Sequence, residues 1–256
     1  MSEGPPQLKR AATEFLVIVG GILAAFYVEE FRETRGDRAL EREYAQQIAS
    51  DLDDALETVS GGVQLATRRS YAGRVVLTHL SGGPQQTPSH LIMAAYEVAL
   101  YPITRERRLG RRTTYDEMVT TGNLRTIVDT GLRHSLARYY EEYARIGGRL
   151  EDSPEEWRVW VYRLLSPDVV LSLSQVVRND VEGCFSEAEM QDHCSLAIPS
   201  EDELRFVRQL QSEAEYARGE LHRVVRYQDR QISDLAGFLE ATTALREELS
   251  ASGLLR

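Results

Sequence analysis

The chain has 256 residues, of which 42% are hydrophobic and 27% are charged, so it can bury a sizeable core and does not have the composition of a disordered protein. Its formal net charge is -10, and the first 28 residues contribute two acids and two bases, which leaves the remainder equally acidic. Because nucleic-acid binding depends largely on neutralising phosphates, this charge argues against a nucleic-acid partner.

The N-terminal region is predicted to enter a membrane. Residues 1–10 are expected to form a flexible N-terminus, and residues 11–28 follow with Glu14 as their only charge. At about 1.5 Å per residue this segment spans about 27 Å, close to the roughly 30 Å of a hydrocarbon core. With Phe31 at the far interface, we predict one transmembrane helix over residues 11–31.

The predicted span could be a cleaved signal peptide or an uncleaved signal anchor. Helix-forming sequence continues past the best cleavage point, so the signal anchor is favoured. Small residues four positions apart allow two membrane helices to approach closely, and the span holds two overlapping pairs of this kind. The predicted transmembrane contact residues are Gly20, Ala24, Gly21 and Ala25.

The helix is predicted to continue beyond the span, because apolar residues recur on one face over residues 40–63. A strict heptad starting at Leu40 would bury acids, so this face is typical of a bundle-packing helix rather than a two-stranded coiled coil. Gly61 and Gly62 could bend the helix before it ends near Leu80.

A basic loop follows the next predicted helix. Thr87 and Pro88 supply an N-cap and a first-turn proline for a short apolar helix over residues 89–100. The loop could bind phosphate, anionic lipid headgroups or an acidic partner, although we favour a solvated connector that offsets nearby acids. Its five arginines are Arg105, Arg107, Arg108, Arg111 and Arg112.

The middle of the chain is predicted to contain four helices. Thr113 or Thr114 with Asp116 or Glu117 indicates a capping box, and Gly122 ends that compact helix. Serine-proline pairs then start helices over residues 154–165 and 168–179, the second of which has strand-like propensity. Between the compact helix and these two helices, a helix over residues 129–150 is predicted from a heptad stripe. The stripe consists of Leu132, Leu136, Tyr139, Tyr143, Ile146 and Leu150.

Two cysteines, Cys184 and Cys194, lie in a predicted loop over residues 181–199. Their spacing is compatible with a disulfide in an oxidising compartment, and two free thiols are the alternative. A metal site that adds His193 would lack a fourth ligand.

The last predicted helix is the longest outside the anchor. A capping box of Ser200 and Glu203 starts it, and a heptad pattern carries it to about Leu249. Only Gln228, Gln231 and Thr242 interrupt the heptad. A helix of this length needs an equally long neighbour, so we predict an antiparallel pair with the helix that leaves the membrane. The predicted fold is all-α, with one N-terminal transmembrane helix continuing over residues 32–256 into an elongated three- or four-helix bundle with coiled-coil-like packing.

Two segments resemble a known protein family. They are residues 14–44, EFLVIVGGILAAFYVEEFRETRGDRALEREY, and residues 113–143, TTYDEMVTTGNLRTIVDTGLRHSLARYYEEY. Both are similar to an uncharacterised family of bacterial single-pass membrane proteins with an N-terminal anchor, an E/R-rich helix and a TYxE…SGNL-type motif. The resemblance implies a bacterial inner-membrane protein and implies no catalytic residue. The motif positions are Thr114, Tyr115, Glu117, Gly122, Asn123 and Leu124, and the paired aromatics are Tyr139 and Tyr140.

The sequence predicts an interaction protein rather than an enzyme. It contains no nucleophile elbow, HExxH motif, phosphate-binding loop or EF-hand, so no catalytic residue, metal or cofactor is predicted. Long heptad surfaces favour a membrane-anchored helical scaffold that self-associates or serves as accessory subunit of a larger membrane complex. Its expected partners are the lipid bilayer and either itself or other membrane-protein subunits. The alternative is a membrane-anchored sensor or small-anion-binding bundle, in which the motif and the arginine loop form a pocket.

Topology signals in the sequence conflict. Four arginines after the span outnumber the two bases before it, which favours a cytoplasmic C-terminal part. The cysteine pair and the signal-anchor character favour the periplasm, and large domains are translocated regardless of charge. We expect a single-pass protein of the bacterial inner membrane with a periplasmic C-terminal part.

Overall fold

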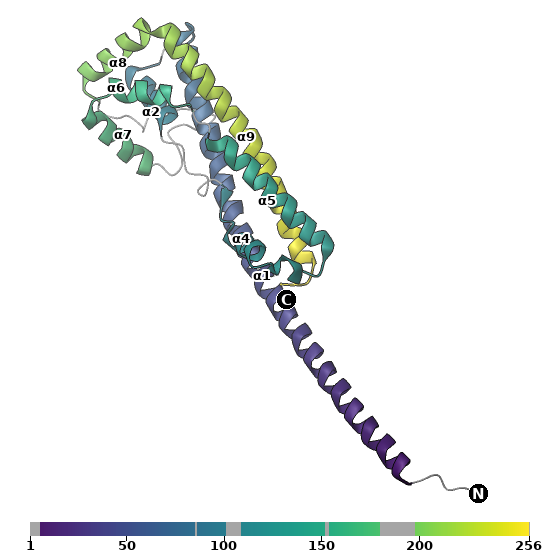
Figure 1. Cartoon of the computed structure of the whole chain (residues 1–256). Coiled ribbons are helices and arrows are strands. Elements are labelled where there is room, and N and C mark those ends of the chain that lie inside the picture. Colours follow the sequence, from purple (N-terminus) through teal and green to yellow (C-terminus); the bar gives the residue numbers. More distant parts are fainter. Residues whose placement is uncertain (1–5, 85, 101–108, 152–153, 180–197, 256) are drawn as a thin grey trace.

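The molecule is elongated and helical (Figure 1). Our computed structural model describes residues 6–84, 86–100, 109–151, 154–179 and 198–255. Within these helices the side chains of residues 6–14, 16, 17, 33, 34, 151, 176–179 and 200 are not described. Every regular element in the described ranges is a helix, which confirms the predicted all-α fold.

The first helix, α1 (Pro6–Leu80), has 75 residues and extends far beyond the rest of the molecule (Figure 1). It runs through Gly36 and Gly61 without a break. The predicted N-terminal segment and the bundle-packing segment that follows it are therefore parts of one helix. Across the described residues, no helix has both the length and the apolar character needed to cross a membrane. The predicted span includes side chains that are not described, at residues 11–14, 16 and 17. The transmembrane helix and the signal anchor therefore stay predictions.

The helix α9 (Ala214–Ala251) packs antiparallel against α1, as predicted. Arg246 Nε contacts Asp53 Oδ1 at 2.7 Å towards one end of the pair, and Arg74 Nη2 contacts Asp229 Oδ2 at 2.9 Å towards the other. The helices approach closely beside the second ion pair, since a Cβ atom added at Gly73 would lie 2.5 Å from a methyl group of Val225.

One core surrounds the half of this pair nearer the free end of α1, and we call it the proximal bundle. It combines residues 40–63 of α1 and residues 235–255, which are the end of α9 and the turn after it, with three other elements. These are α4 (Thr113–Thr120), the short 3-10 helix η1 (Asn123–Thr126) and α5 (Thr130–Glu151). All six predicted heptad residues of α5 are buried. α5 is antiparallel to α9, because Ser135 bonds Glu248 while Arg149 bonds Asp234.

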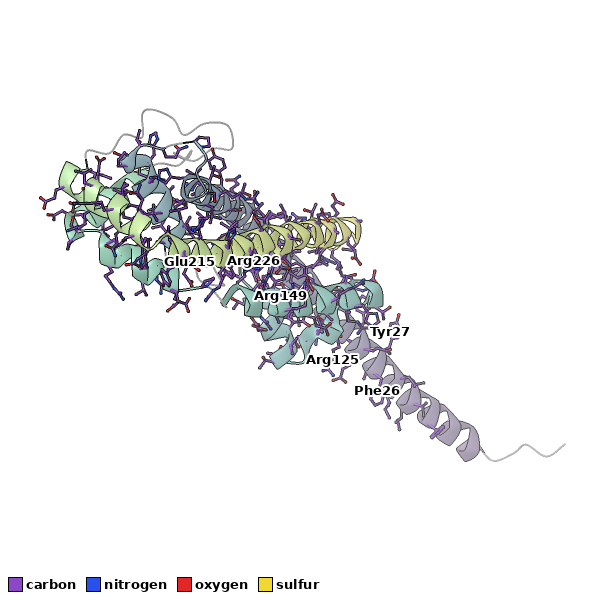
Figure 2. The ribbon with its side chains drawn as sticks, turned by 90° about the horizontal axis from the view of Figure 1, so that it is seen from above. Phe26, Tyr27, Arg125, Arg149, Glu215 and Arg226 are labelled. Atoms are coloured by element: carbon purple, nitrogen blue, oxygen red, sulfur yellow. The ribbon has the colours of Figure 1, made fainter. Side chains whose placement is uncertain are left out.

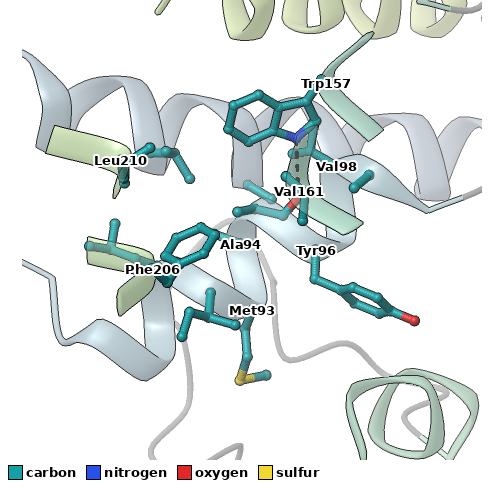
Figure 3. Close-up of a cluster of buried hydrophobic side chains, with 14 of the residues drawn as sticks. Met93, Ala94, Tyr96, Val98, Trp157, Val161, Phe206 and Leu210 are labelled. Carbon is teal, nitrogen blue, oxygen red and sulfur yellow. Dashed lines mark hydrogen bonds between the residues drawn. The ribbon is translucent and has the colours of Figure 1, made fainter. Parts of the chain in front are cut away.

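A second core, the distal head, surrounds the other half of the pair. Here α2 (Pro88–Ala99), α6 (Glu156–Leu164), α7 (Pro167–Asn179) and α8 (Ser200–Ser212) pack on α1 and α9. Nine consecutive residues of α2 are buried, so this apolar helix forms the centre of the head. Figure 3 shows Trp157 beside α2, where its indole Nε1 donates to the carbonyl of Ala95 at 3.2 Å. The helical interpretation of residues 168–179 is confirmed.

The long C-terminal helix is not continuous, contrary to the prediction. The chain breaks at Glu213, whose carboxylate accepts from Trp160 Nε1 at 2.7 Å, and α8 turns across the head instead of extending α9. The break changes which face is buried: Phe206 is fully buried, whereas the predicted heptad residue Val207 is only partly buried.

The N-caps of two helices differ from those predicted. α4 has Arg112 at its N-cap with no side-chain capping bond, because Asp116 accepts from the Arg112 guanidinium instead. At α8 the N-cap is Pro199, and the Glu203 carboxylate accepts from the hydroxyl of Ser89 in the head. In both cases the acid of the predicted box bonds another side chain.

Candidate functional site

The motif segment lies against α1 and is held by one phenol. Tyr44, on α1, donates its hydroxyl to Glu117 Oε1 at 3.3 Å and accepts from Asn123 Nδ2 at 2.9 Å. Gly122 joins these two motif residues with a φ of 73°, a left-handed conformation that favours glycine. The structure therefore brings Glu117, Gly122 and Asn123 together, and gives each of them a role in packing α4 and η1 onto α1.

A continuous stack of aromatic rings connects this motif to the other two helices of the proximal bundle. The rings of Tyr115 and Tyr140 are 4.0 Å apart and nearly parallel, and Tyr139 meets Tyr140 edge-on at 4.9 Å. Tyr139 in turn stacks on Phe238 of α9 at 4.9 Å. Each offset or edge-on pair contributes about 0.5–1.5 kcal/mol beyond its buried area. The tyrosines predicted as core residues are thus confirmed as core, and Tyr140 joins them.

The tyrosine hydroxyls lie in a poorly hydrated environment. Burial raises the pKa of Tyr139 to about 12 and raises the pKa of Tyr140 as well, and the carboxylate of Asp51 adds to both shifts. The Tyr140 hydroxyl and one carboxylate oxygen of Asp51 are buried and have no hydrogen-bond partner among the described residues. Phenols with such raised pKa values stay neutral near pH 7 and are poor general bases there. The cluster is chemically suited to packing and to donating hydrogen bonds.

The predicted arginine patch is described only in part, since Arg105, Arg107 and Arg108 lie outside the described residues. Arg111 Nε lies 4.0 Å from the Asp54 carboxylate, with both side chains largely exposed. Arg112 Nε donates to Asp116 at 2.8 Å, and its guanidinium covers the ring of Tyr143. The hydrogen bond to Asp116 is the main cause of the raised pKa of Arg112. Both described arginines therefore face an acid of their own chain, as expected for a charge-offsetting connector.

A groove between α5 and α9 was not predicted from the sequence. It has a volume of about 470 Å³ and lies over Tyr139 and Leu245. Small residues of α9 form one wall, and polar residues of α5 form the other. The available signal was the recurrence of small residues on one face of the final helix. These wall residues are Gly237, Ala241 and Ala244 on α9, and Ser135, Arg138 and Glu142 on α5.

The predicted transmembrane contact residues lie on the projecting part of α1. Gly20, Gly21, Ala24 and Ala25 are all exposed, and a Cβ atom added at either glycine would meet no described neighbour within 4 Å. Figure 2 shows Phe26 and Tyr27 on this same projection. Cys184 and Cys194 lie outside the described residues, as does the predicted loop up to residue 197. In the part of the chain that the structure describes, no three His, Cys, Asp or Glu side chains form a group that could hold a metal ion.

We compared the chain with protein-family models, curated proteins and solved structures, and none of them matches. Its function must therefore be inferred from the arrangement of its own residues.

Proposed function

We propose that the protein is a membrane-anchored helical scaffold or interaction protein of the bacterial inner membrane. The observation that carries this proposal is the projecting end of α1, where large apolar side chains are exposed around the whole helix. A helix that is apolar all round is stable when protein or lipid covers it. These exposed residues are Phe15, Ile18, Ile22, Leu23, Phe26, Tyr27, Val28 and Phe31.

A bilayer is the partner that fits this surface. Apolar surface left in water costs about 25 cal/mol per Å², so eight large exposed side chains in one helix would favour insertion or aggregation. Aromatic residues gather at the bundle end of the segment, where Phe26, Tyr27 and Phe31 suit a headgroup interface.

The scaffold role follows from the continuity of α1. At about 1.5 Å per residue, its 75 residues span about 110 Å, and both cores of the molecule are built on it. The motif residues and the tyrosine stack pack the chain against itself, which supports a rigid arm that presents helical surfaces at a set distance from a membrane.

Membrane fractionation tests this proposal. The full-length protein should stay in the membrane pellet after alkaline carbonate extraction. Replacing Ile18 and Ile22 with arginine should release it, because a central arginine costs about 2.5–3.5 kcal/mol on insertion scales. The matched control, Ala39→Arg with Arg42→Ala, moves one positive charge between two exposed positions after the span. It should leave the protein in the pellet. Recovery of the unaltered protein in the soluble fraction would refute membrane anchorage.

The proposed topology has its own test. We place the C-terminal part in the periplasm, following the signal-anchor character of the N-terminus and the cysteine pair. Protease added to spheroplasts should then digest the part after Val28. Survival of that part in intact spheroplasts, with digestion after lysis, would place it in the cytoplasm.

The groove between α5 and α9 supports a second candidate function, a ligand-binding sensor. Tyr139 and Leu245 form the floor of the groove, and Arg138, Glu142 and Glu248 place one positive and two negative groups around it. A thermal-shift screen of small anions tests this candidate against unaltered protein and two variants, Arg138→Glu in the groove and Arg111→Glu with Arg112→Glu in the loop. A shift that only one variant abolishes would favour a sensor and locate its site.

A further inference from the structure

A lone, charged stretch of α1 separates the apolar projection from the proximal bundle. Every described side chain over residues 29–39 is exposed, and burial begins at Leu40 and Glu41. At about 1.5 Å per residue, this stretch holds the bundle about 18 Å away from the end of the apolar segment. We call it the spacer. A polar helix with no neighbour gains little stability from packing, so its charge pattern is informative.

Four of the charges in the spacer and just after it form two stripes. Glu30 and Asp37 are seven residues apart and share one side of the helix, while Arg35 and Arg42 share another. All four side chains are exposed. Between the two stripes runs a third line of residues that continues back into the apolar projection. It contains Gly20, Ala24, Tyr27, Phe31, Thr34 and Arg38.

The flanking charges follow the e and g pattern of a parallel two-stranded coiled coil, with Phe31 as the apolar core residue of the spacer. Placing Phe31 at position a puts Tyr27 at d, the two acids at g and the two arginines at e. In a parallel pair, each g residue faces the e residue five positions later on the other helix. Glu30 would then face Arg35 of the other helix, and Asp37 would face Arg42, so both pairs on both sides are attractive.

We infer that a second copy of this chain packs in parallel along this face of the spacer, forming a dimer between the membrane and the two bundles. The inference rests on the proposed membrane anchorage, because a single-pass anchor holds two copies in the same orientation. A two-fold axis along the helices brings the acidic stripe of each copy opposite the basic stripe of the other. A second copy thus matches both stripes at once.

The structure also limits the length of the contact between the two α1 helices, which we call the seam. Glu41 and Tyr44 are buried in their own bundle, where Glu41 Oε1 accepts from the backbone nitrogen of Val128 at 2.7 Å. The two α1 helices must therefore separate soon after Arg38. In the other direction Gly20 and Ala24 continue the same face with small side chains, which permits close approach. Arg38 at a central position weakens the seam and disfavours other registers.

Disulfide cross-linking in membranes tests the seam on the full-length chain carrying Cys184→Ser and Cys194→Ser. Phe31→Cys lies at a central position and should form a dimer on mild oxidation. Gly36→Cys lies on the outer side of the same exposed helix and should give about tenfold less dimer. Ala24→Cys against Ala25→Cys repeats the comparison with Phe31 intact. Equal cross-linking within both pairs, no cross-linking, or a cross-link to a different protein would overturn the inference.

Charge exchange tests which residues hold the seam. In the Phe31→Cys background, Arg35→Glu with Arg42→Glu places like charges opposite each other and should reduce the dimer about tenfold. Adding Glu30→Arg and Asp37→Arg restores opposite charges and should restore the dimer. A dimer that is insensitive to the first pair, or that the second pair does not rescue, would refute the seam.

The two proposals fail in different ways. Cross-linking is measured only on protein that remains in the carbonate-washed pellet. Protein absent from that pellet refutes the anchorage, and with it the parallel orientation on which the dimer depends. Protein present in the pellet with no position-dependent cross-link refutes only the dimer.

Discussion

The proximal bundle and the distal head share α1 and α9 but build their cores differently. In the proximal bundle one long helix, α5, supplies a regular heptad face, and stacked tyrosines fill the space between helices. In the distal head three short helices, α6, α7 and α8, pack around α2, and the stacked pair is formed by two tryptophans. The comparison shows that one helical pair can support a core built on one long heptad helix and a core built around one short buried helix.

Between the two cores lies a polar region, which we call the waist. Glu97 of α2 is 1% exposed, and its carboxylate lies 3.0 Å from Arg68 Nε and 3.9 Å from Arg69 Nε. On the α9 side, Gln228 and Gln231 are buried. A buried charge is stable only when paired, so the waist depends on these arginines. It marks where the two regions could unfold separately.

The largest expected effects come from removing a central aromatic residue of either core. Trp157→Ala in the head and Phe238→Ala in the proximal bundle should each lower the free energy of unfolding by about 3–5 kcal/mol, since both leave large cavities. Hydrogen exchange should show lost protection in α2 and α6 for the first variant, and in α5 for the second. Protection lost equally everywhere in both variants would mean that the two regions form one cooperative unit.

Glu97→Gln should have the next largest effect. It neutralises the buried carboxylate that lies beside two arginines, at a cost of about 3 kcal/mol, and it acts where the two cores meet. Urea titration in mild detergent measures the change. The control is Arg74→Gln, which breaks an ion pair with Asp229 whose side chains are 61% and 40% exposed and should cost less than about 1 kcal/mol. Equal costs for the two variants would show that the waist is not specifically stabilised by Glu97.

The regular elements of this fold were predictable because their signals are long and local. The six heptad residues of α5 repeat over three turns or more, and all of them are buried. The antiparallel pairing of α1 and α9 followed from length alone. Even the residues that interrupt the α9 heptad lie in register, since Gln228, Gln231 and Thr242 are buried. Thr242 satisfies its hydroxyl by bonding the carbonyl of Phe238 and the hydroxyl of Tyr139.

The parts that were not predicted depend on residues far apart in the chain. The break at Glu213 follows from a contact with Trp160, 53 residues away, and no residue near the break signals it. In the candidate site, Tyr44 bonds Glu117 and Asn123, which are 73 and 79 residues away in the chain. The motif sequence therefore gives no sign that Tyr44 contacts it. The acids of the two predicted capping boxes bond other side chains: Glu203 accepts from Ser89, which is 114 residues away, and Asp116 accepts from the neighbouring Arg112.

Two glycine-to-alanine substitutions in α1 test how closely α1 and α9 pack within the distal head. Gly73→Ala should cost about 1–3 kcal/mol, because the added methyl group meets Val225 and forces α9 to shift. Gly61→Ala lies on the same helix with open space around it and should stabilise by about 0.5–1 kcal/mol. Thermal unfolding of both variants tests this difference. A stabilising Gly73→Ala would indicate that the two helices are farther apart than the structure places them.

The smallest expected effect is a pH dependence of the stability of the proximal bundle, which contains Tyr139. Because the native pKa of Tyr139 is about 12 and the unfolded value is about 10, the neutral phenol stabilises the fold fully below pH 10. That contribution is lost as pH rises from 10 to 12, since the unfolded state releases its proton first, at about 1.4 kcal/mol per pH unit. Tyr139→Phe should be slightly less stable at pH 8, having lost the Thr242 hydrogen bond, and should lose about 1 kcal/mol less than the unaltered protein between pH 9 and 11. Urea titrations at these pH values measure both effects, and an unchanged pH dependence in the variant would mean that Tyr139 ionises as readily in the folded chain as in the unfolded one.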